Sequence, residues 1–323
     1  MKILVTGCAG FIGFHTCLKL IKFSNYEIFG IDNLNNYYDI NLKKDRLKKL
    51  KKHKNFYFKK LDISKKKLLN SFFKQHKFKI VINLAAQAGV RYSILDPDTY
   101  FKNNILGFYN ILDVSRLSKV SHFIFASSSS VYGNIKKFPI KEEYRTDCPQ
   151  SFYAATKKSN EVIAYSYSSI YNMPITGLRF FTVYGPYGRP DMSLFKFTKA
   201  MITNKKLQLY NNGNHIRDFT YIDDVAESVV RISMQKPKMK VPFSIFNIGS
   251  NNPQKLMKFL KTISSILNKE PKIEYKSMQK GDVYKTHASV SQLFKEIKFK
   301  PKTSINVGIK KFINWYKDYY KKS

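Results

Sequence analysis

The sequence of 323 residues contains few of the residues that bind metals or form disulfides. Its three cysteines, Cys8, Cys17 and Cys148, have neither metal-ligand spacing nor an even pairing pattern, which favours a reducing compartment such as the cytoplasm. The six histidines are scattered without ligand spacing, so we expect no structural metal. No apolar run reaches the roughly 18 residues of a membrane helix. Three glycines interrupt the apolar start, which argues against a secretory signal.

Arginine is also scarce. The formal net charge is +35, but only eight of the 57 basic residues are Arg and the others are Lys. Arg is preferred for bidentate recognition of bases and phosphates, so a selected nucleic-acid surface would contain more of it. The chain is rich in Asn, Ile, Phe and Tyr, whose codons are rich in A and T, and a drift in base composition accounts for this pattern. We expect weak adhesion to polyanions and no specific nucleic-acid partner.

The first 32 residues follow the order strand, glycine turn, helix, strand and acid. Residues 2–6 are β-branched and apolar, and the segment Gly7-Cys-Ala-Gly10-Phe-Ile-Gly13 leads into an apolar-periodic stretch over residues 14–21. A second apolar run, 27–31, ends on Asp32. Glycines let the backbone approach a pyrophosphate at a helix N-terminus, and an acid at this distance can accept hydrogen bonds from a ribose diol. The order predicts dinucleotide binding, with NAD preferred to NADP.

Strands and helices continue to alternate until about residue 180. We predict strands over residues 55–60, 79–84, 122–126, 174–180 and 244–248, and helices over residues 99–116, 151–171, 225–234 and 305–316. This alternation predicts an α/β fold, with a Rossmann-type doubly wound parallel sheet and a smaller, mixed α/β substrate-binding domain. The NAD-binding domain is expected over residues 1–179, with a return around 220–249, and the substrate domain mainly over residues 180–323.

The segment Tyr153-Ala-Ala-Thr-Lys157 carries the most informative chemical pattern. Residues four apart lie on one face of a helix, and a fixed ammonium stabilises a nearby phenolate. A phenolate can take a proton from a sugar hydroxyl while a dinucleotide takes the hydride. A chain so rich in Lys and Tyr could also carry this pattern as an ordinary surface pair. The serine run from Ser127 to Ser130 gives it weight, because it lies at the predicted carboxyl end of a strand, where open α/β sheets bind ligands.

Further recognisable runs accompany the glycine segment and the set of Ser128, Tyr153 and Lys157. One extends from Arg217 to Asp224, and three longer ones are Gly30-Ile-Asp-Asn-Leu-Asn-Asn-Tyr-Tyr38, Ala85-Ala-Gln-Ala-Gly-Val-Arg-Tyr-Ser93 and Arg179-Phe-Phe-Thr-Val-Tyr-Gly-Pro-Tyr-Gly-Arg-Pro-Asp-Met192. With the first group of motifs, essentially the whole chain resembles the extended short-chain dehydrogenase/reductases that act on nucleotide sugars. The three longer runs resemble most closely those of the UDP-glucuronate 4-epimerases.

The resemblance implies a role for each matching position. Tyr153 would be the general base, Lys157 its electrostatic partner and Ser128 a hydrogen-bond partner of the sugar 4-hydroxyl. The cofactor residues would be Gly7, Gly10, Phe11, Ile12, Gly13, Asp32, Asn33, Asp62, Ile63, Leu84, Ala85, Ala86 and Asn104, together with Tyr153 and Lys157. The substrate residues would be Arg91, Ser128, Ser129, Thr182, Arg189, Arg217 and Asp282. In this set Arg217 would clamp the UDP phosphates, and Thr182 with Arg189 would face a sugar carboxylate. A loop-fixing ion pair with Asp191 is the alternative for Arg189.

The expected activity is C4 epimerisation of a UDP-hexuronic acid with tightly bound NAD, by a homodimer. A UDP-hexose or UDP-N-acetylhexosamine 4-epimerase would differ only at the carboxylate site. A UDP-glucuronate decarboxylase and an inactive dinucleotide-binding sensor are further alternatives, although a sensor would commonly lack the Tyr or the Lys. Dehydratases of the family carry an Asp-Glu pair where this chain has Ser129 and Ser130, which argues against elimination of water.

Overall fold

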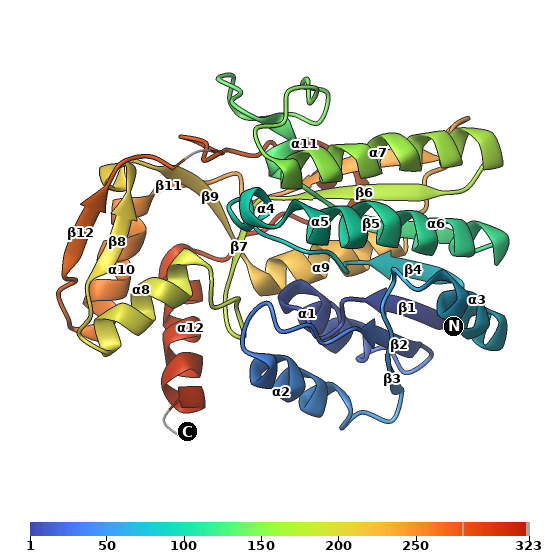
Figure 1. The fold of residues 1–323 in the computed structure, drawn as a ribbon, viewed down its shortest axis with the longest axis horizontal. Coiled ribbons are helices and arrows are strands. Elements are labelled where there is room, and N and C mark those ends of the chain that lie inside the picture. Colours follow the sequence, from blue (N-terminus) through green and yellow to red (C-terminus); the bar gives the residue numbers. More distant parts are fainter. Residues whose placement is uncertain (280, 321–323) are drawn as a thin grey trace.

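A seven-stranded parallel sheet forms the centre of the computed structural model, which describes residues 1–279 and 281–320 (Figure 1). The strand order is β10-β6-β5-β4-β1-β2-β3. The strands are β1 (Lys2–Thr6), β2 (Glu27–Asp32), β3 (Phe56–Lys60), β4 (Ile80–Asn83), β5 (His122–Ser128), β6 (Ile175–Phe180) and β10 (Phe243–Ile248). Every predicted strand is therefore present. The strand β5 is longer than predicted, so Ser127 and Ser128 form its carboxyl end.

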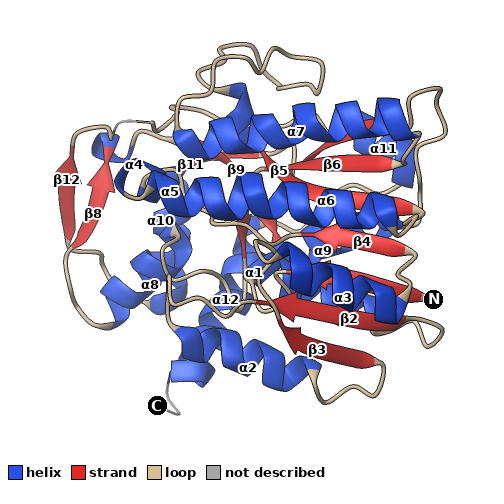
Figure 2. Ribbon diagram, turned by 45° about the vertical axis from the view of Figure 1, so that its right-hand side comes forward, coloured by secondary structure: helices blue, strands red, loops and turns tan. Residues whose placement is uncertain are grey.

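Helices cover both faces of this sheet, as expected for a doubly wound fold (Figure 2). One face carries α3 (Lys66–His76), α6 (Gly107–Leu117) and α7 (Phe152–Tyr171), and the other carries α1 (Phe11–Leu20), α9 (Ile222–Ser233) and α11 (Ser291–Ile297). The helix α2 (Ile40–Leu50) packs beside α1. The stretch predicted as one helix over residues 99–116 is divided into α5 (Pro97–Tyr100), a π-helical turn (Phe101–Leu106) and α6, and α4 (Tyr92–Leu95) precedes it. The helix α7 begins where predicted because the Ser151 hydroxyl accepts the Ala154 N–H at 3.1 Å.

The remaining elements gather beside the carboxyl ends of the large sheet (Figure 1). The strands β7 (Thr182–Tyr184), β9 (Ile216–Tyr221) and β11 (Pro253–Lys255) form a mixed sheet, and β8 (Leu207–Tyr210) pairs in parallel with β12 (Ile273–Lys276). The helices α8 (Ser193–Ile202), α10 (Leu256–Leu267) and α12 (Ile305–Tyr320) pack around them. The smaller mixed α/β part of the predicted fold is thus present, while the domain boundary after residue 179 stays a prediction.

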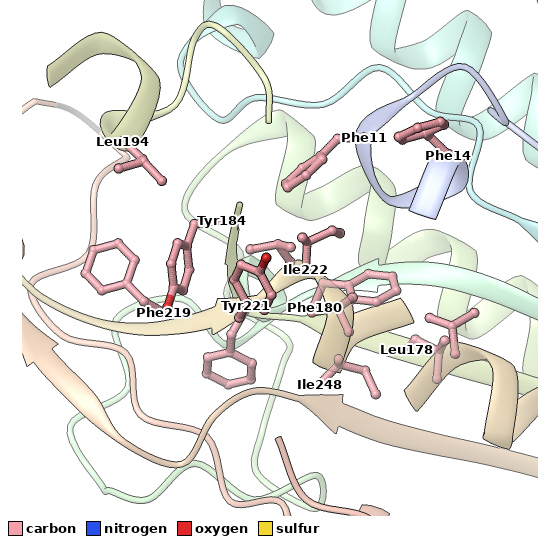
Figure 3. Close-up of a cluster of buried hydrophobic side chains, with 14 of the residues drawn as sticks. Phe11, Phe14, Leu178, Phe180, Tyr184, Leu194, Phe219, Tyr221, Ile222 and Ile248 are labelled. Carbon is pink, nitrogen blue, oxygen red and sulfur yellow. The ribbon is translucent and has the colours of Figure 1, made fainter. Parts of the chain in front are cut away.

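A buried apolar cluster connects the large sheet with these elements (Figure 3). Leu178 and Ile248 come from the sheet, while Tyr184 and Phe219 come from β7 and β9 (Figure 3). The Phe219 ring stacks on Phe259 of α10 with 4.0 Å between the ring centroids. Aromatic residues bury the largest apolar area per side chain, so this cluster holds the smaller sheet firmly against the strand ends. No helix within residues 1–279 and 281–320 is long and apolar enough to cross a membrane.

Candidate active site

The glycine turn after β1 is shaped so that only glycine fits at two positions. Gly7 has a φ of +69°, and a side chain there would approach the Ala85 backbone nitrogen at 2.8 Å. A Cβ on Gly13 would lie 2.1 Å from the Gly7 carbonyl oxygen. The turn therefore packs directly against the end of β4 and presents the N-terminus of α1 without side chains in the way. This is the shape that a pyrophosphate group needs at a helix N-terminus.

Asp32 lies at the end of β2, beside the glycine turn. Its carboxylate accepts the Leu34 N–H at 2.8 Å and the Ala9 N–H at 3.1 Å. Burial raises the pKa of Asp32, while these two N–H groups and the Lys43 ammonium act in the opposite direction. The carboxylate is thus fixed by the backbone at the place where the ribose of a dinucleotide is expected. Lys43 lines the same cleft as Asp32, and the sequence analysis missed it because it lies in a lysine-rich stretch.

A cleft of about 1010 Å³ runs from the glycine turn to the smaller sheets. Nearly all predicted site residues line it, and the exceptions are Asp62 and Asn104. Asp62 accepts a hydrogen bond from Asn33 at 3.1 Å, so it supports a residue of the wall. Asn104 accepts the Gln87 N–H at 2.8 Å and donates to the Gln87 carbonyl at 3.0 Å, and it thereby fixes the loop after β4. The predicted contact of these two residues with the cofactor stays a prediction.

Tyr153, Lys157 and Ser128 all line the cleft, and the Tyr153 and Ser128 side chains are hydrogen-bonded to each other. Burial raises the pKa of Tyr153, while the Ser128 hydroxyl and the Arg189 charge oppose this shift. Burial lowers the pKa of Lys157 to about 8, and its ammonium donates to the Ala126 carbonyl at 2.8 Å. Ser128 and Arg189 thus stabilise the phenolate form of Tyr153, although burial keeps its pKa above the usual value. The stabilisation by Lys157 that the sequence suggested is not among these effects and stays a prediction.

Arg189 is already paired at the sugar end of the cleft. Its Nε and Nη2 atoms donate to the two carboxylate oxygens of Asp191 at 3.0 and 2.5 Å. Burial acts to raise the pKa of Asp191, but the Arg189 guanidinium outweighs this effect and the pKa is lowered. The alternative considered for Arg189 is thus present, yet the charge of Arg189 still reaches Tyr153. Asp191 and Tyr37, whose hydroxyl lies 3.4 Å from Asp191, are wall residues that the sequence analysis did not select.

A second group of charges surrounds the far mouth of the cleft. Arg91 donates to Asp282 at 2.8 Å and lies over the Tyr210 ring. Arg217 donates to the Ile216 and Tyr284 carbonyls at 3.1 and 3.0 Å. Within the described ranges 1–279 and 281–320, Arg217 has no carboxylate within 4.0 Å. Burial and the charge of Arg91 lower the pKa of Arg217 to about 10, against the effect of Asp282. A partly buried and incompletely compensated cation of this kind favours an anionic ligand.

Several lining residues were not selected by the sequence analysis. Gln87 follows β4, and Gln208 and Tyr210 lie on β8. Strand β8 was not predicted, since the alternation in Leu207–Tyr210 extends over only four residues. In the part of the chain that the structure describes, no three His, Cys, Asp or Glu side chains gather as metal ligands would.

Comparison with known proteins agrees with this arrangement of fold and cleft. The family profile described as GDP-mannose 4,6 dehydratase matches residues 4–312. Protein CapI of Staphylococcus aureus is 49% identical, with 100% of both chains covered. A probable UDP-glucuronate 4-epimerase of Rhizobium meliloti is 38% identical over 100% of this chain and 99% of that protein. The UDP-glucuronic acid 4-epimerase of Bacillus cereus, solved with UDP-glucuronic acid and NAD, superimposes with a TM-score of 0.93 at 33% identity, over 99% of this chain and 100% of that one.

The chain therefore belongs to the extended short-chain dehydrogenase/reductase family of NAD-dependent nucleotide-sugar epimerases. Within that family it is an NAD-dependent nucleotide-sugar 4-epimerase. The resemblance found in the sequence and the predicted fold class are both confirmed.

Proposed function

We propose that the protein interconverts UDP-glucuronate and UDP-galacturonate by inverting C4 of the sugar. The observation that carries this proposal is the partly buried guanidinium of Arg189, which lines the cleft and acts on the pKa of Tyr153. A cation so close to the reacting centre suits a sugar with a carboxylate at C6. Similarity to UDP-glucuronate 4-epimerases supports the same substrate.

The cofactor end of the cleft fits NAD. The glycine turn would hold the pyrophosphate, Asp32 the adenosine ribose, and Lys157 the nicotinamide ribose. Bound NAD supplies a place for the C4 hydride and later returns it. The negative charge of Asp32 would repel the 2′-phosphate of NADP.

Tyr153 would act as the proton acceptor and donor during epimerisation. Its phenolate oxygen would take the O4 proton as the C4 hydride leaves, and the hydroxyl so formed would return that proton after the flat 4-keto sugar has turned its other face. Ser128 would hold O4 through a hydrogen bond, and a cationic nicotinamide ring would add to the stabilisation of the phenolate. Atoms and electrons balance over the cycle, since both the hydride and the proton return to the sugar.

Two arginines at the mouth of the cleft would bind the UDP diphosphate. Arg217 would remain in place, because the Ile216 and Tyr284 carbonyls already orient its guanidinium. Arg91 would exchange Asp282 for a phosphate oxygen. With the UDP held there, the sugar could rotate without leaving the cleft.

The carboxylate needs a firm hold because a 4-keto uronate is a β-keto acid and can lose CO2. Thr182 and Ser129 line the cleft together with Arg189. If these residues hold the carboxylate close to the ring plane, its C–C bond cannot align with the keto group, and decarboxylation is disfavoured. This separates the proposed activity from that of a decarboxylase.

The test is to incubate the purified protein with UDP-glucuronate and to identify the products by proton NMR. We expect UDP-galacturonate without added NAD. A UDP-pentose would identify a decarboxylase. Turnover of UDP-glucose or UDP-N-acetylglucosamine in preference to UDP-glucuronate would reject the carboxylate assignment and leave a neutral-sugar epimerase.

We also propose that the protein acts as a cytoplasmic homodimer. Large apolar side chains are exposed along two neighbouring helical segments: Phe101, Leu106 and Leu117 on one, and Phe152, Val162 and Ile170 on α7. Two such pairs can meet across a two-fold axis as a four-helix bundle, and this would remove the apolar surface from water. A monomeric mass in light scattering at micromolar concentration would contradict this assembly.

A further inference from the structure

A buried ion pair lies behind the catalytic residues. Glu161 of α7 and Arg179 of β6 have side chains only 5% and 6% exposed. The Arg179 Nε atom donates to one Glu161 oxygen at 2.8 Å, and Nη2 donates to the other at 2.9 Å. The Ser127 hydroxyl donates to the first of these oxygens at 2.6 Å. We refer to Ser127, Glu161 and Arg179 as the buried clamp.

The buried clamp joins the two elements that carry the catalytic side chains. Ser127 directly precedes Ser128 on β5, and Glu161 follows Lys157 by one helical turn on α7. Ser127 on β5 is the register partner of Arg179 on β6. The two side chains therefore reach Glu161 of α7 from adjacent positions of the sheet. Neighbouring residues of a strand point to opposite sides, and this leaves Ser128 to meet Tyr153 in the cleft.

Further hydrogen bonds fix the arginine of the clamp. Its Nη1 atom donates to the Tyr132 hydroxyl at 2.8 Å and to the Glu142 carbonyl at 2.9 Å. The Tyr132 hydroxyl in turn donates to Asn247, the neighbour of Arg179 on β10, at 2.7 Å. The guanidinium is thus held by groups from several elements, and little freedom remains for Glu161 or Ser127.

Stability alone does not account for such an arrangement. A buried ion pair loses as much in desolvation as it gains in attraction, and apolar residues of similar volume often serve equally well. What an ion pair with directed hydrogen bonds adds is a fixed geometry. Epimerisation needs this, because the same Tyr and Ser must serve a sugar that presents first one face and then the other. A misplacement of about 1 Å can cost about 100-fold in rate.

We propose that the buried clamp is a positioning device that keeps α7 and the end of β5 at a fixed separation during both hydride transfers. Glu161, Arg179 and Ser127 are positioning residues, since they hold together the two elements from which Tyr153 and Ser128 reach the cleft. This proposal rests on the proposed function only in its use of a 4-keto sugar, and it holds for whichever UDP-sugar the protein epimerises.

Ser127→Ala tests the clamp, because it removes one hydroxyl and leaves the ion pair in place. Without this hydrogen bond Tyr153 and Ser128 should be less well positioned, so we expect kcat to fall by about tenfold or more, with KM and bound NAD unchanged. The isotope effect with substrate deuterated at C4 should rise, because misplaced groups slow hydride transfer itself. Ser127→Thr, which keeps a hydroxyl, should restore both values. Ser168→Ala is the matched control, since it removes a buried hydroxyl without a partner from the far end of the same helix.

Glu161→Gln should lower kcat further than Ser127→Ala. If this variant does not fold, the serine variants decide alone. The proposal is overturned if Ser127→Ala keeps the wild-type kcat and isotope effect, or if it merely melts earlier with both values unchanged well below its melting temperature. A wild-type preference for a neutral UDP-sugar would instead reject the proposed substrate, and the same variants would then be measured with that sugar.

Discussion

The two ends of the cleft are built in different ways. At the cofactor end, one continuous segment from Lys2 to Asp32 provides the strand, the turn, the helix and the acid. At the sugar and nucleotide end, the charged residues Arg91, Arg189, Arg217 and Asp282 come from loops and strands far apart in the sequence. The first end is shaped mainly by the backbone, whereas the second consists of side chains.

The pairing of charge differs as well. Asp32 is held by two backbone N–H groups, so a ribose would add to its contacts without breaking any ion pair. Arg189 and Arg91 are each paired with a carboxylate that an anionic substrate would have to displace or share. The cofactor end is therefore prepared for permanent occupancy, and the substrate end for exchange. Substitutions at either end, or where the two ends meet, therefore test this contrast.

The largest effect is expected at the junction of the two ends. Tyr153→Phe should preserve folding and NAD binding but lower turnover by at least about 100-fold, because the proton transfer loses its group. Lys157→Ala should act similarly, and Ser128→Ala somewhat less. Steady-state kinetics on UDP-glucuronate with NAD content measured in parallel would check this.

Tyr165→Phe is the control, since it removes the same hydroxyl from an exposed position on the same helix. Near-normal turnover in the Tyr153 variant would mean that another residue is the base.

The contrast also explains what the sequence could predict. The large sheet, the helix α7 and the cofactor end follow from local patterns, because apolar periodicity and glycine spacing act over a few residues. The ion pairs Arg91–Asp282 and Glu161–Arg179 join residues whose approach depends on the whole topology, so no local pattern reports them. The π-helical turn at Phe101–Leu106 was also not predicted, because the apolar spacing of this stretch fits one continuous helix. The close packing of Gly107, where a side chain would meet Ile63 at 2.8 Å, is likewise a contact made only in three dimensions.

A second prediction concerns the stability of the protein without cofactor. Burial that lowers the pKa of Lys157 to about 8 costs the folded state about 3 kcal/mol at neutral pH. Lys157→Met should therefore raise the free energy of unfolding by up to about that amount below pH 8. Between pH 8 and about 10.4, the folded wild type has released a proton that the unfolded chain still binds, so its stability rises and the difference shrinks.

Denaturant unfolding of the cofactor-free protein at pH 7 and pH 10 would measure this gain. Lys261→Met, on the exposed surface of α10, should change stability by less than about 0.5 kcal/mol at either pH. A Lys157 variant that is less stable than wild type at pH 7 would show that burial of the ammonium is fully compensated.

Arg189→Ala tests the charge at the sugar end. We expect a loss of about 2 kcal/mol in transition-state binding of the uronate, at the low end of what removal of a buried charge partner costs, because Asp191 already neutralises the arginine. A neutral UDP-sugar should be little affected. Arg189→Lys should rescue partially, since it keeps the charge but loses the fork.

Comparison of kcat/KM for UDP-glucuronate and UDP-glucose would show the selectivity. Asp191→Asn is the matched control, because it breaks the same ion pair but leaves the arginine in place. Equal losses for both sugars in the Arg189→Ala variant would mean that the pair only fixes the loop.

The smallest effect is expected at the mouth of the cleft, where the Arg91–Asp282 pair has side chains 45% and 15% exposed. Partly exposed ion pairs contribute about 0 to 1 kcal/mol. Asp282→Asn removes a carboxylate that competes with phosphate for Arg91 and that stabilises the charge of Arg217. The affinity for UDP should therefore rise by a few-fold in calorimetry, and the gain should diminish at high salt, because screening weakens both interactions.

Asp147→Asn is the control, because Asp147 forms an exposed pair with Arg145 that does not line the cleft, and it should leave the affinity unchanged. A loss of affinity in the Asp282 variant would instead assign this carboxylate a direct contact with the nucleotide. Asp282 would then be part of the binding site, and UDP would not have to displace it from Arg91.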